Sequence, residues 1–383
     1  MNNQRWLSQS YFIFFFTWGV YLQYWSGWLS EAKGLTASQV GYIMGIGLIA
    51  RAVATMFAFP FATKFLSGKK LILVLVVASL VVTLLYLPAN SFETLLMITF
   101  LFSLIYPALL PAIENSATTL MQTSQINYGK SRSYGSIGFV IAVLIISFIV
   151  GIAGERAILW CMIAFLSIML LMQTLPTPAV LLVKPTAEDR GKSSSMIGLF
   201  KIKGFSIILL IVVLLQGSMA SYYNYSYLYL QQYLDVNPLY IGIILNIAVI
   251  SEIIYLLKAD RFGHWKTSKL LIVAGIASTV RWIMIFVFPN VWAFIISQTL
   301  HSLSFAMAHF AFIQYISKTL PKQQLSNAQG VYSALGMSLS AALLTLFGGF
   351  LYEIQPGLSF LGMIVFTIPA VLIIYVTRKK YQY

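Results

Sequence analysis

Long apolar runs alternate with short polar segments along the whole sequence. Twelve of these runs hold about 20 residues or more, the length that an α-helix needs to cross the ~30 Å hydrocarbon core of a bilayer. The pattern therefore predicts an all-α integral membrane protein with twelve transmembrane helices. The expected spans are 6–30, 39–66, 70–88, 93–121, 131–153, 156–175, 204–232, 238–258, 267–288, 291–317, 325–351 and 358–377.

The composition agrees with this prediction. Of the 383 residues, 59% are hydrophobic and 9% are charged, which lies outside the range of a soluble domain. The net charge of +14 would suit a nucleic-acid binder, but such proteins gather their basic residues on one soluble face, whereas here they alternate with apolar spans. The single cysteine, Cys161, lies in an apolar run, so neither a disulfide nor a cysteine-based metal site is expected.

The positive charges fall on one side of the expected membrane. With the N-terminus placed in the cytoplasm, nearly all of the 24 Lys and Arg residues lie on the cytoplasmic side. The exceptions are Lys33, Arg51, Arg156 and Arg281. By the positive-inside rule, this asymmetry supports an even number of spans with both termini in the cytoplasm.

The longest polar gap divides the chain into two halves. We expect an N-terminal six-helix bundle over 1–176, a cytoplasmic linker over 177–203 and a C-terminal six-helix bundle over 204–383. The halves resemble each other, since 38–43 (SQVGYI) matches 239–244 (LYIGII) at an offset of 201 and 134–138 (YGSIG) matches 332–336 (YSALG) at an offset of 198. Two matches at nearly one offset favour duplicated halves related by an axis along the membrane normal.

Glu114 and Arg132 are charged residues in two consecutive spans. They are eighteen positions apart, so a helical hairpin that turns near Thr123 brings them to the same depth. A lone charge at the bilayer centre costs roughly 2.5–3.5 kcal/mol, and a pair that faces the protein interior avoids much of that cost. We expect the pair to serve a substrate or ion path. The alternative is an ordinary loop cation beside a structural acid.

A second charged set lies in the C-terminal half. Glu252, Arg281 and His301 occupy the eighth, ninth and tenth spans, where they can converge on one proton site. Approach and withdrawal of an arginine changes the proton affinity of a carboxylic acid, and histidine can relay a proton near physiological pH. His309 lies eight residues beyond His301 on roughly the same helix face, with packing among phenylalanines as the alternative interpretation.

The seventh span is rich in hydroxylated rings. Tyr222, Tyr223 and Asn224 lie deep enough in it to form a cavity wall for a flat or hydroxyl-bearing ligand. Tyr24 in the first span is a similar candidate. An aromatic belt at the membrane interface explains the same residues without a ligand.

The charged residues of the fourth and fifth spans carry a family resemblance. The runs 110–114 (LPAIE) and 129–138 (GKSRSYGSIG) resemble the helix 4–5 signature of the lactose-permease-like branch of the major facilitator superfamily, and 280–282 (VRW) and 300–302 (LHS) fit the same branch. Within it, 134–139 (YGSIGF), 251–253 (SEI) and 300–305 (LHSLSF) are most similar to the phenylpropionate-permease and nucleoside:proton-symporter families. The resemblance covers essentially all twelve expected helices.

The resemblance implies alternating access through a central cavity, with substrate moving alongside a proton. In the lactose-permease pattern, the helix 4 acid and the helix 5 arginine hold the substrate, which implies that role for Glu114 and Arg132. The helix 8 acid, helix 9 arginine and helix 10 histidine handle protonation or its coupling, which implies those roles for Glu252, Arg281 and His301.

The sequence departs from that pattern in two places. The lactose permease has an acid one turn after the helix 10 histidine, where this chain has Ser304, so the proton carrier has to be Glu252 or a histidine. The superfamily's inner-loop pattern places Gly and Asp around basic residues. Its acid is missing at 62–70, whereas 260–264 (DRFGH) keeps more of the pattern. We therefore expect Asp260 and Arg261, together with Arg51 in the second span, to serve structure or gating.

These observations predict a secondary transporter of the cell (inner) membrane that imports a small organic solute with a proton. No phosphate-binding loop, HExxH motif or nucleotide fingerprint occurs, so ATP-driven pumping by this chain is not expected. The histidines at 264, 301 and 309 are poorly arranged for an enzyme site, and no metal or cofactor is expected apart from the coupling proton. The expected partners are a small-molecule substrate and the lipid bilayer, with no nucleic acid, and the chain is expected to be a monomer.

The substrate stays open between two classes. Intramembrane arginines suit an aromatic acid, whereas Glu114 with the tyrosines and Asn224 suits a sugar or nucleoside. A slight preference goes to neutral polyols, because a buried acid beside an anionic ligand is unfavourable. A non-transporting receptor or scaffold and an efflux antiporter are the alternative functions.

Overall fold

The computed structural model describes the chain except for residues 1–2, 56–61, 64, 125 and 184–195. The described residues are helical, with short connecting turns. By its internal contacts the chain divides into two compact units. The first comprises Met1–Leu35 and Ile49–Ser193, and the second comprises Thr36–Leu48 and Ser194–Tyr383.

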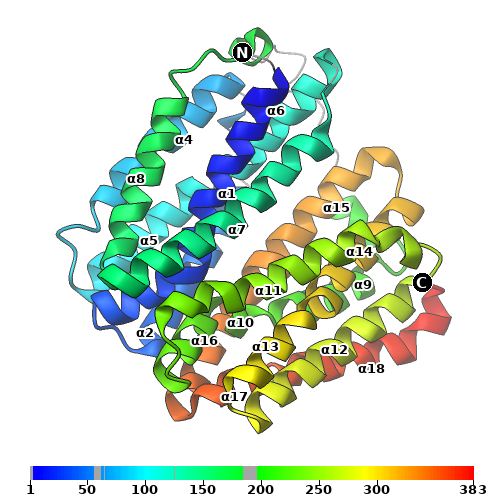
Figure 1. Ribbon diagram of the computed structural model, residues 1–383. Helices are drawn as coiled ribbons and strands as arrows, with labels where there is room; N and C mark the ends of the chain where they lie inside the picture. Colours follow the sequence, from blue (N-terminus) through cyan, green and yellow to red (C-terminus); the bar gives the residue numbers. More distant parts are fainter. Residues whose placement is uncertain (1–2, 56–61, 64, 125, 184–195) are drawn as a thin grey trace. The chain divides into compact units, whose positions relative to one another are not determined.

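The first unit is built from α1, the end of α2 and helices α4 to α8, shown in blue to green in Figure 1. In that unit α1 and α7 lie side by side (Figure 1), and they form its most extensive helix pair. The elements are α1 (Asn3–Gly27), η1 (Trp28–Ala32), α2 (Ala37–Val53), α4 (Gly68–Leu84), α5 (Phe92–Ile105), η3 (Tyr106–Ala108), α6 (Leu109–Thr123), α7 (Tyr128–Ala153), α8 (Ala157–Met172) and η4 (Ala179–Leu182).

The second unit holds the remaining helices, and its largest helix pair is formed by α12 and α18. The first part of α2 also belongs to this unit, which the sequence pattern did not indicate. The elements are η6 (Met196–Lys201), α9 (Phe205–Gly217), α10 (Ala220–Leu228), η7 (Tyr229–Tyr233), α11 (Pro238–Leu257), η8 (Ala259–Phe262), α12 (Thr267–Val287), α13 (Val291–Thr299), η9 (Ser302–Ala306), α14 (Met307–Thr319), α15 (Lys322–Ala334), η10 (Leu335–Leu339), α16 (Ser340–Ile354), α17 (Pro356–Leu361) and α18 (Ile364–Tyr381).

These elements join into twelve helical runs in the described part of the chain, which confirms the predicted twelve-helix, all-α membrane fold. Eight of the runs are long and apolar enough to cross a membrane by themselves. Polar residues at the ends of loops cap the helices that follow, as Ser91 does for α5 and Asn290 for α13. The side chain of each cap accepts a hydrogen bond from the backbone N–H of the residue three positions later.

Several runs are interrupted by tighter or wider turns. Pro107 cannot donate a backbone hydrogen bond, and the 3₁₀ turn η3 separates α5 from α6 around it. The first and seventh helical runs both end in a π-helical segment, η1 and η7 respectively. The two segments are 201 residues apart, which is the offset between the matching sequences of the two halves. This correspondence supports an internal duplication, while the domain limits at 176 and 203 stay a prediction.

Glycines allow close helix contacts in both units. A Cβ atom at Gly138 of α7 would lie 2.5 Å from the carbonyl oxygen of Phe12 in α1, so those two backbones touch. In the second unit, a Cβ at Gly41 in α2 would lie 3.2 Å from the carbonyl oxygen of Thr345 in α16. The α1–α7 contact fixes α7, the helix that carries Arg132, against α1.

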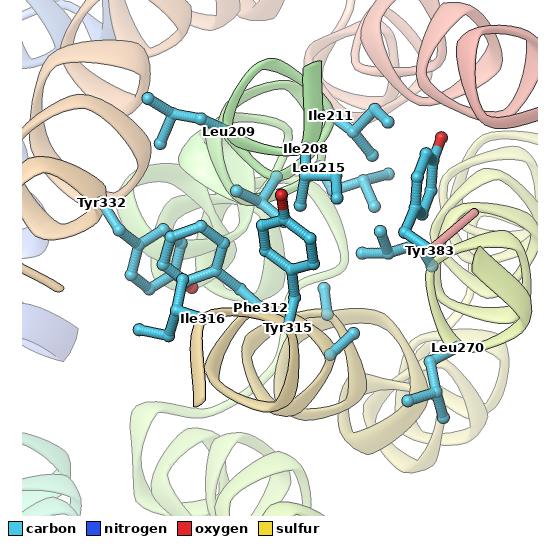
Figure 2. Packing of buried hydrophobic residues seen from close by; sticks show 14 of the residues in the cluster. Ile208, Leu209, Ile211, Leu215, Leu270, Phe312, Tyr315, Ile316, Tyr332 and Tyr383 are labelled. Atoms are coloured by element: carbon cyan, nitrogen blue, oxygen red, sulfur yellow. The ribbon is translucent and has the colours of Figure 1, made fainter. Parts of the chain in front are cut away.

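The apolar core of the second unit lies between α9, α12, α14 and α18 (Figure 2). The rings of Phe312 and Tyr332 stack within it at a centroid distance of 4.4 Å, and Tyr383 closes it near the end of the chain. This packing holds α14 and η9 in place, and the helical run that they continue carries His301.

Candidate functional site

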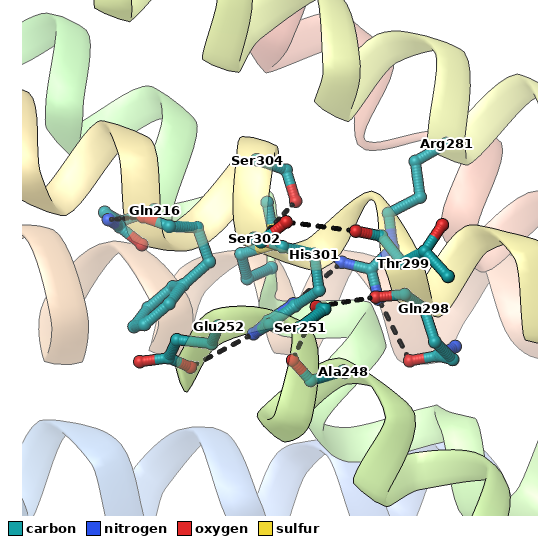
Figure 3. Close-up of polar contacts among 12 residues, drawn as sticks. Gln216, Ala248, Ser251, Glu252, Arg281, Gln298, Thr299, His301, Ser302 and Ser304 are labelled. Carbon is teal, nitrogen blue, oxygen red and sulfur yellow. Dashed lines mark hydrogen bonds and ion pairs between the residues drawn. The ribbon is translucent and has the colours of Figure 1, made fainter. Parts of the chain in front are cut away.

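Three ionisable side chains of the second unit form a continuous chain of contacts (Figure 3). His301 Nδ1 lies 3.0 Å from Arg281 Nη1, and His301 Nε2 lies 3.8 Å from Glu252 Oε2. His301 lies between α13 and η9, Arg281 lies in α12, and Glu252 lies in α11. The convergence predicted for these three spans is therefore confirmed as geometry.

Arg281 is fully buried, and neutral groups surround its charge. Its Nη2 atom donates to Gln298 Oε1 at 3.3 Å, and its Nη1 atom also lies 3.8 Å from the sulfur of Met219. The guanidinium carbon lies 4.3 Å from the ring centroid of Tyr222, which is a cation–π contact. The buried Nε atom has no hydrogen-bond partner within the described part of the chain.

The contact with Arg281 decides which nitrogen of His301 carries the proton. An arginine side chain only donates hydrogen bonds, so Nδ1 of His301 has to accept and stays unprotonated. In the neutral ring the proton is then on Nε2, which faces Glu252. A second proton would have to sit on Nδ1 against the guanidinium, and this disfavours the imidazolium form.

The exposure of the three side chains differs. Arg281 and His301 are 0% and 3% exposed, whereas the side chain of Glu252 is 28% exposed. Ser251 beside Glu252 donates to the carbonyl oxygens of Ala248 and Gln298, which ties α11 to α13 at this level. Within the triad, Glu252 is thus the most exposed member.

Aromatic rings continue the site along the helical run of His301. The ring of Phe305 stacks between His301 at 5.2 Å and His309 at 6.5 Å, with interplanar angles of 9° and 8°. This stack crosses the π-helical turn η9, a kind of turn that is frequent at functional sites. The backbone carbonyl of Phe305 accepts a bond from Gln216 (Figure 3), and His309 Nδ1 lies 3.1 Å from the hydroxyl of Tyr332.

The tyrosines predicted from the seventh run lie beside the triad. The ring centroids of Tyr222 and Tyr223 are 5.1 and 6.2 Å from that of His301. Asn224 points elsewhere, because its amide donates to the carbonyl of Ala220 and to the hydroxyl of Thr345 in α16. The first two residues belong to the site by contact, while a substrate role for Asn224 stays a prediction.

A second charged site lies in the first unit. Arg132 Nε is 3.6 Å from Glu114 Oε1, and the two side chains are 35% and 34% exposed. Tyr128 donates to Glu114 Oε2 at 2.9 Å, and the guanidinium of Arg132 lies 4.2 Å from the ring centroid of Phe15. The pairing predicted from the eighteen-residue spacing is confirmed, and α6 ends at Thr123 as expected.

Other predicted residues lie apart from these two sites. Tyr24 is buried between α1 and α7, where its hydroxyl donates to the carbonyl of Val143 at 2.7 Å. Arg51 lies 5.3 Å from the ring centroid of Trp18 in the first unit. Arg261 is exposed in η8, and the side chain of Asp260 lies outside the described residues. Their predicted roles in substrate binding and gating stay predictions.

Two uncharged residues of the site were not singled out from the sequence. Gln298 accepts from Arg281, and Phe305 stacks on both histidines. A glutamine three residues before His301 in an apolar run was a usable signal, because a buried amide needs partners. Within the described residues, no group of three or more His, Cys, Asp or Glu side chains is arranged to hold a metal ion.

Comparisons with known proteins agree with this architecture. The chain matches the family described as "MFS_1 like family" over residues 4–361. The "Probable 3-phenylpropionic acid transporter" of Escherichia coli (strain K12) is 28% identical over 381 residues, which cover 97% of both chains. The "Maltose permease" of Geobacillus stearothermophilus is 27% identical over 374 residues, which cover 97% of this chain and 93% of that protein.

Solved structures show the same fold. The crystal structure of the nucleoside transporter NupG matches 100% of both chains with a TM-score of 0.81 at 18% identity. A POT family transporter in complex with a thioalcohol-conjugated peptide matches 99% of this chain and 96% of its own with a TM-score of 0.77 at 12% identity. Since the family match spans most of the sequence, the chain belongs to the MFS_1 like family and is a multi-pass membrane transporter of small solutes from the major facilitator superfamily.

Proposed function

We propose that the chain is a proton-coupled symporter that imports a small organic solute by alternating access, with Glu252 as the proton carrier. The observation that carries this proposal is the contact chain from Arg281 through His301 to Glu252. Ionisable groups held inside a membrane at high cost generally mark substrate or ion pathways.

Glu252 is the best carrier of the three residues. Arginine does not give up its proton in proteins, and a second proton on His301 would face the Arg281 guanidinium. Glu252 is also the most exposed of the three, so a proton can reach it and leave it. When Glu252 gains or loses a proton, the net charge beside His301 changes. In a symporter, this change has to be coupled to the movement of the substrate.

We assign the solute to the Glu114–Arg132 pair. Both side chains are about one third exposed, and their pairing leaves carboxylate and guanidinium positions open to a ligand. A carboxylate accepts from hydroxyl groups and a guanidinium donates to oxygens, while the ring of Phe15 offers a surface for stacking. This combination favours a neutral hydroxylated solute such as a sugar or nucleoside.

One observation favours an aromatic acid instead. The buried Nε atom of Arg281 has no hydrogen-bond partner within the described residues, and the rings of Tyr222 and Trp282 lie against the same guanidinium. A carboxylate with an apolar ring would fit such a group. Relatives of both kinds occur, since one is named for 3-phenylpropionic acid and another for maltose.

Solute-driven proton uptake tests both parts of the proposal. The purified chain is reconstituted in liposomes, and external pH is recorded while sugars, nucleosides and aromatic acids are added one at a time. We expect one solute class to cause external alkalinisation that a protonophore abolishes. Exchange of a solute without any proton movement would contradict symport and leave a uniporter or exchanger.

A further inference from the structure

A lateral groove on the second unit takes no part in the transport mechanism proposed above. It has a volume of about 380 Å³ and is framed by α9, η10, α16 and α18. Its lining is apolar except for Ser206 and Ser340. Leu210 and Leu343 in this lining are 43% and 55% exposed, so the groove opens sideways on a helix surface of the kind that faces hydrocarbon.

Basic residues gather where α9 begins and α18 ends. Gly204 lies against Tyr381, because a Cβ atom at Gly204 would be 3.4 Å from the Tyr381 ring, so these two helix ends meet. The basic residues on either side of this contact are Lys201, Lys203, Arg378, Lys379 and Lys380. This end of both helices is the one that the positive-inside rule assigns to the cytoplasm.

Acidic residues are missing from the segments that frame the groove. The ranges 196–234, 322–352 and 354–383 contain neither Asp nor Glu. The five cations therefore have no acidic neighbour within their own segments, and Arg378 and Lys380 instead lie over the rings of Tyr375 and Tyr381. The segments that frame the groove therefore supply these five cations and no acidic side chain.

We propose that this groove binds an anionic phospholipid of the inner leaflet. Its phosphate would pair with the basic residues at the α9 and α18 ends, and one acyl chain would lie in the groove. Basic clusters beside transmembrane helices on the cytoplasmic side attract acidic lipids by about 1 kcal/mol for each Lys or Arg. The proposal does not depend on which solute the chain transports.

The dimensions of the groove suit one leaflet. Ser206 follows Lys203 by three residues and is the second residue of α9, so the groove starts just inside the basic cluster. Phe366 precedes Arg378 by twelve residues, or about 18 Å, which reaches the middle of a hydrocarbon core of ~30 Å. A lipid tail anchored at the basic residues would therefore run the length of the groove.

Native mass spectrometry of the full chain in detergent can measure this binding. Phosphatidylglycerol and phosphatidylcholine with identical acyl chains are titrated separately, and soluble glycerol phosphate is added as a competitor. We expect phosphatidylglycerol to bind at least about tenfold more tightly than phosphatidylcholine, as about two cations in contact would provide. Equal affinities, or displacement of the lipid by glycerol phosphate at the same concentration, would overturn the proposal.

Two variants separate the parts of the site. Lys203→Gln with Arg378→Gln should bring phosphatidylglycerol down to the affinity of phosphatidylcholine. Leu343→Trp, at a half-exposed position, should fill the groove and weaken both lipids. The matched control, Lys258→Gln with Lys266→Gln, removes the same charge from exposed positions beyond the groove and should change neither affinity. An equal loss in the control, or unchanged binding in Leu343→Trp, would refute a site in the groove.

Discussion

His301 Nδ1 accepts a hydrogen bond from Arg281 at 3.0 Å, and this contact directs the other ring nitrogen toward Glu252. The histidine therefore holds an arginine and a glutamate apart while contacting both. In the mechanism that we propose, His301 positions the carboxylate and Glu252 carries the transported proton.

Replacement of His301 by glutamine should preserve proton coupling. The glutamine oxygen can accept from Arg281 and its amide nitrogen can donate toward Glu252, so both contacts of the neutral ring are kept. We expect His301→Gln to retain solute-driven proton uptake within about tenfold of the wild-type rate. His301→Ala leaves a buried donor of Arg281 unpaired and should lower stability by about 1–3 kcal/mol. A His301→Gln variant that binds solute yet takes up no protons would identify the histidine as the carrier.

Removal of the Glu114 charge should weaken solute binding. A hydrogen bond to a charged group contributes about 1.5–3 kcal/mol, so Glu114→Gln should raise the Kd of a hydroxylated solute by roughly one to two orders of magnitude. Equilibrium binding of the transported solute measures this change. Glu93→Gln is the matched control, because Glu93 is exposed on the same helical run. Tighter binding in Glu114→Gln would instead indicate an anionic solute, since a repelling carboxylate would have been removed.

The contact between α1 and α7 should tolerate no side chain at Gly138. A methyl group there would come within 2.5 Å of the Phe12 carbonyl oxygen, so the backbones would have to separate. Overpacking of this kind typically costs about 1–3 kcal/mol, and Gly138→Ala should lower the melting temperature in detergent. Gly330→Ala is the control, because that helix position has no atom within 4 Å of an added Cβ. Similar melting temperatures for both variants would show that the two helices separate easily.

Most of the fold could be predicted from the sequence because membrane helices are long and uniformly apolar. The expected span 238–258, for example, corresponds to α11 at Pro238–Leu257. Local breaks were not predictable in the same way. The turn η3 contains Pro107 and the turn η9 lies at the ring stack around Phe305, and neither changes the apolar pattern. The packing of the first part of α2 with the second unit is a tertiary contact that hydropathy does not encode.

The charged members of both sites could be predicted because a charge inside an apolar run is conspicuous. Helical spacing and a turn near Thr123 were sufficient to predict the pairing of Glu114 with Arg132. Gln298 gave a weaker signal, since glutamine is neutral and its partner is set by helix packing. For the same reason the sequence could not distinguish Tyr222, which lies on the Arg281 guanidinium, from Asn224, which bonds to α16.

Proton carriage by Glu252 is tested most directly by separating solute exchange from proton uptake in Glu252→Gln. Wild-type and variant chains are reconstituted in liposomes, and solute counterflow is measured beside solute-driven alkalinisation of the medium. Glu353→Gln serves as the control, because the glutamine oxygen can still accept the Ser38 backbone N–H bond that Glu353 accepts. Glu252→Gln should keep counterflow and lose both proton uptake and the pH dependence of transport, while the control keeps all three. Proton uptake that persists in Glu252→Gln at the wild-type ratio to solute would rule out Glu252 as the proton carrier.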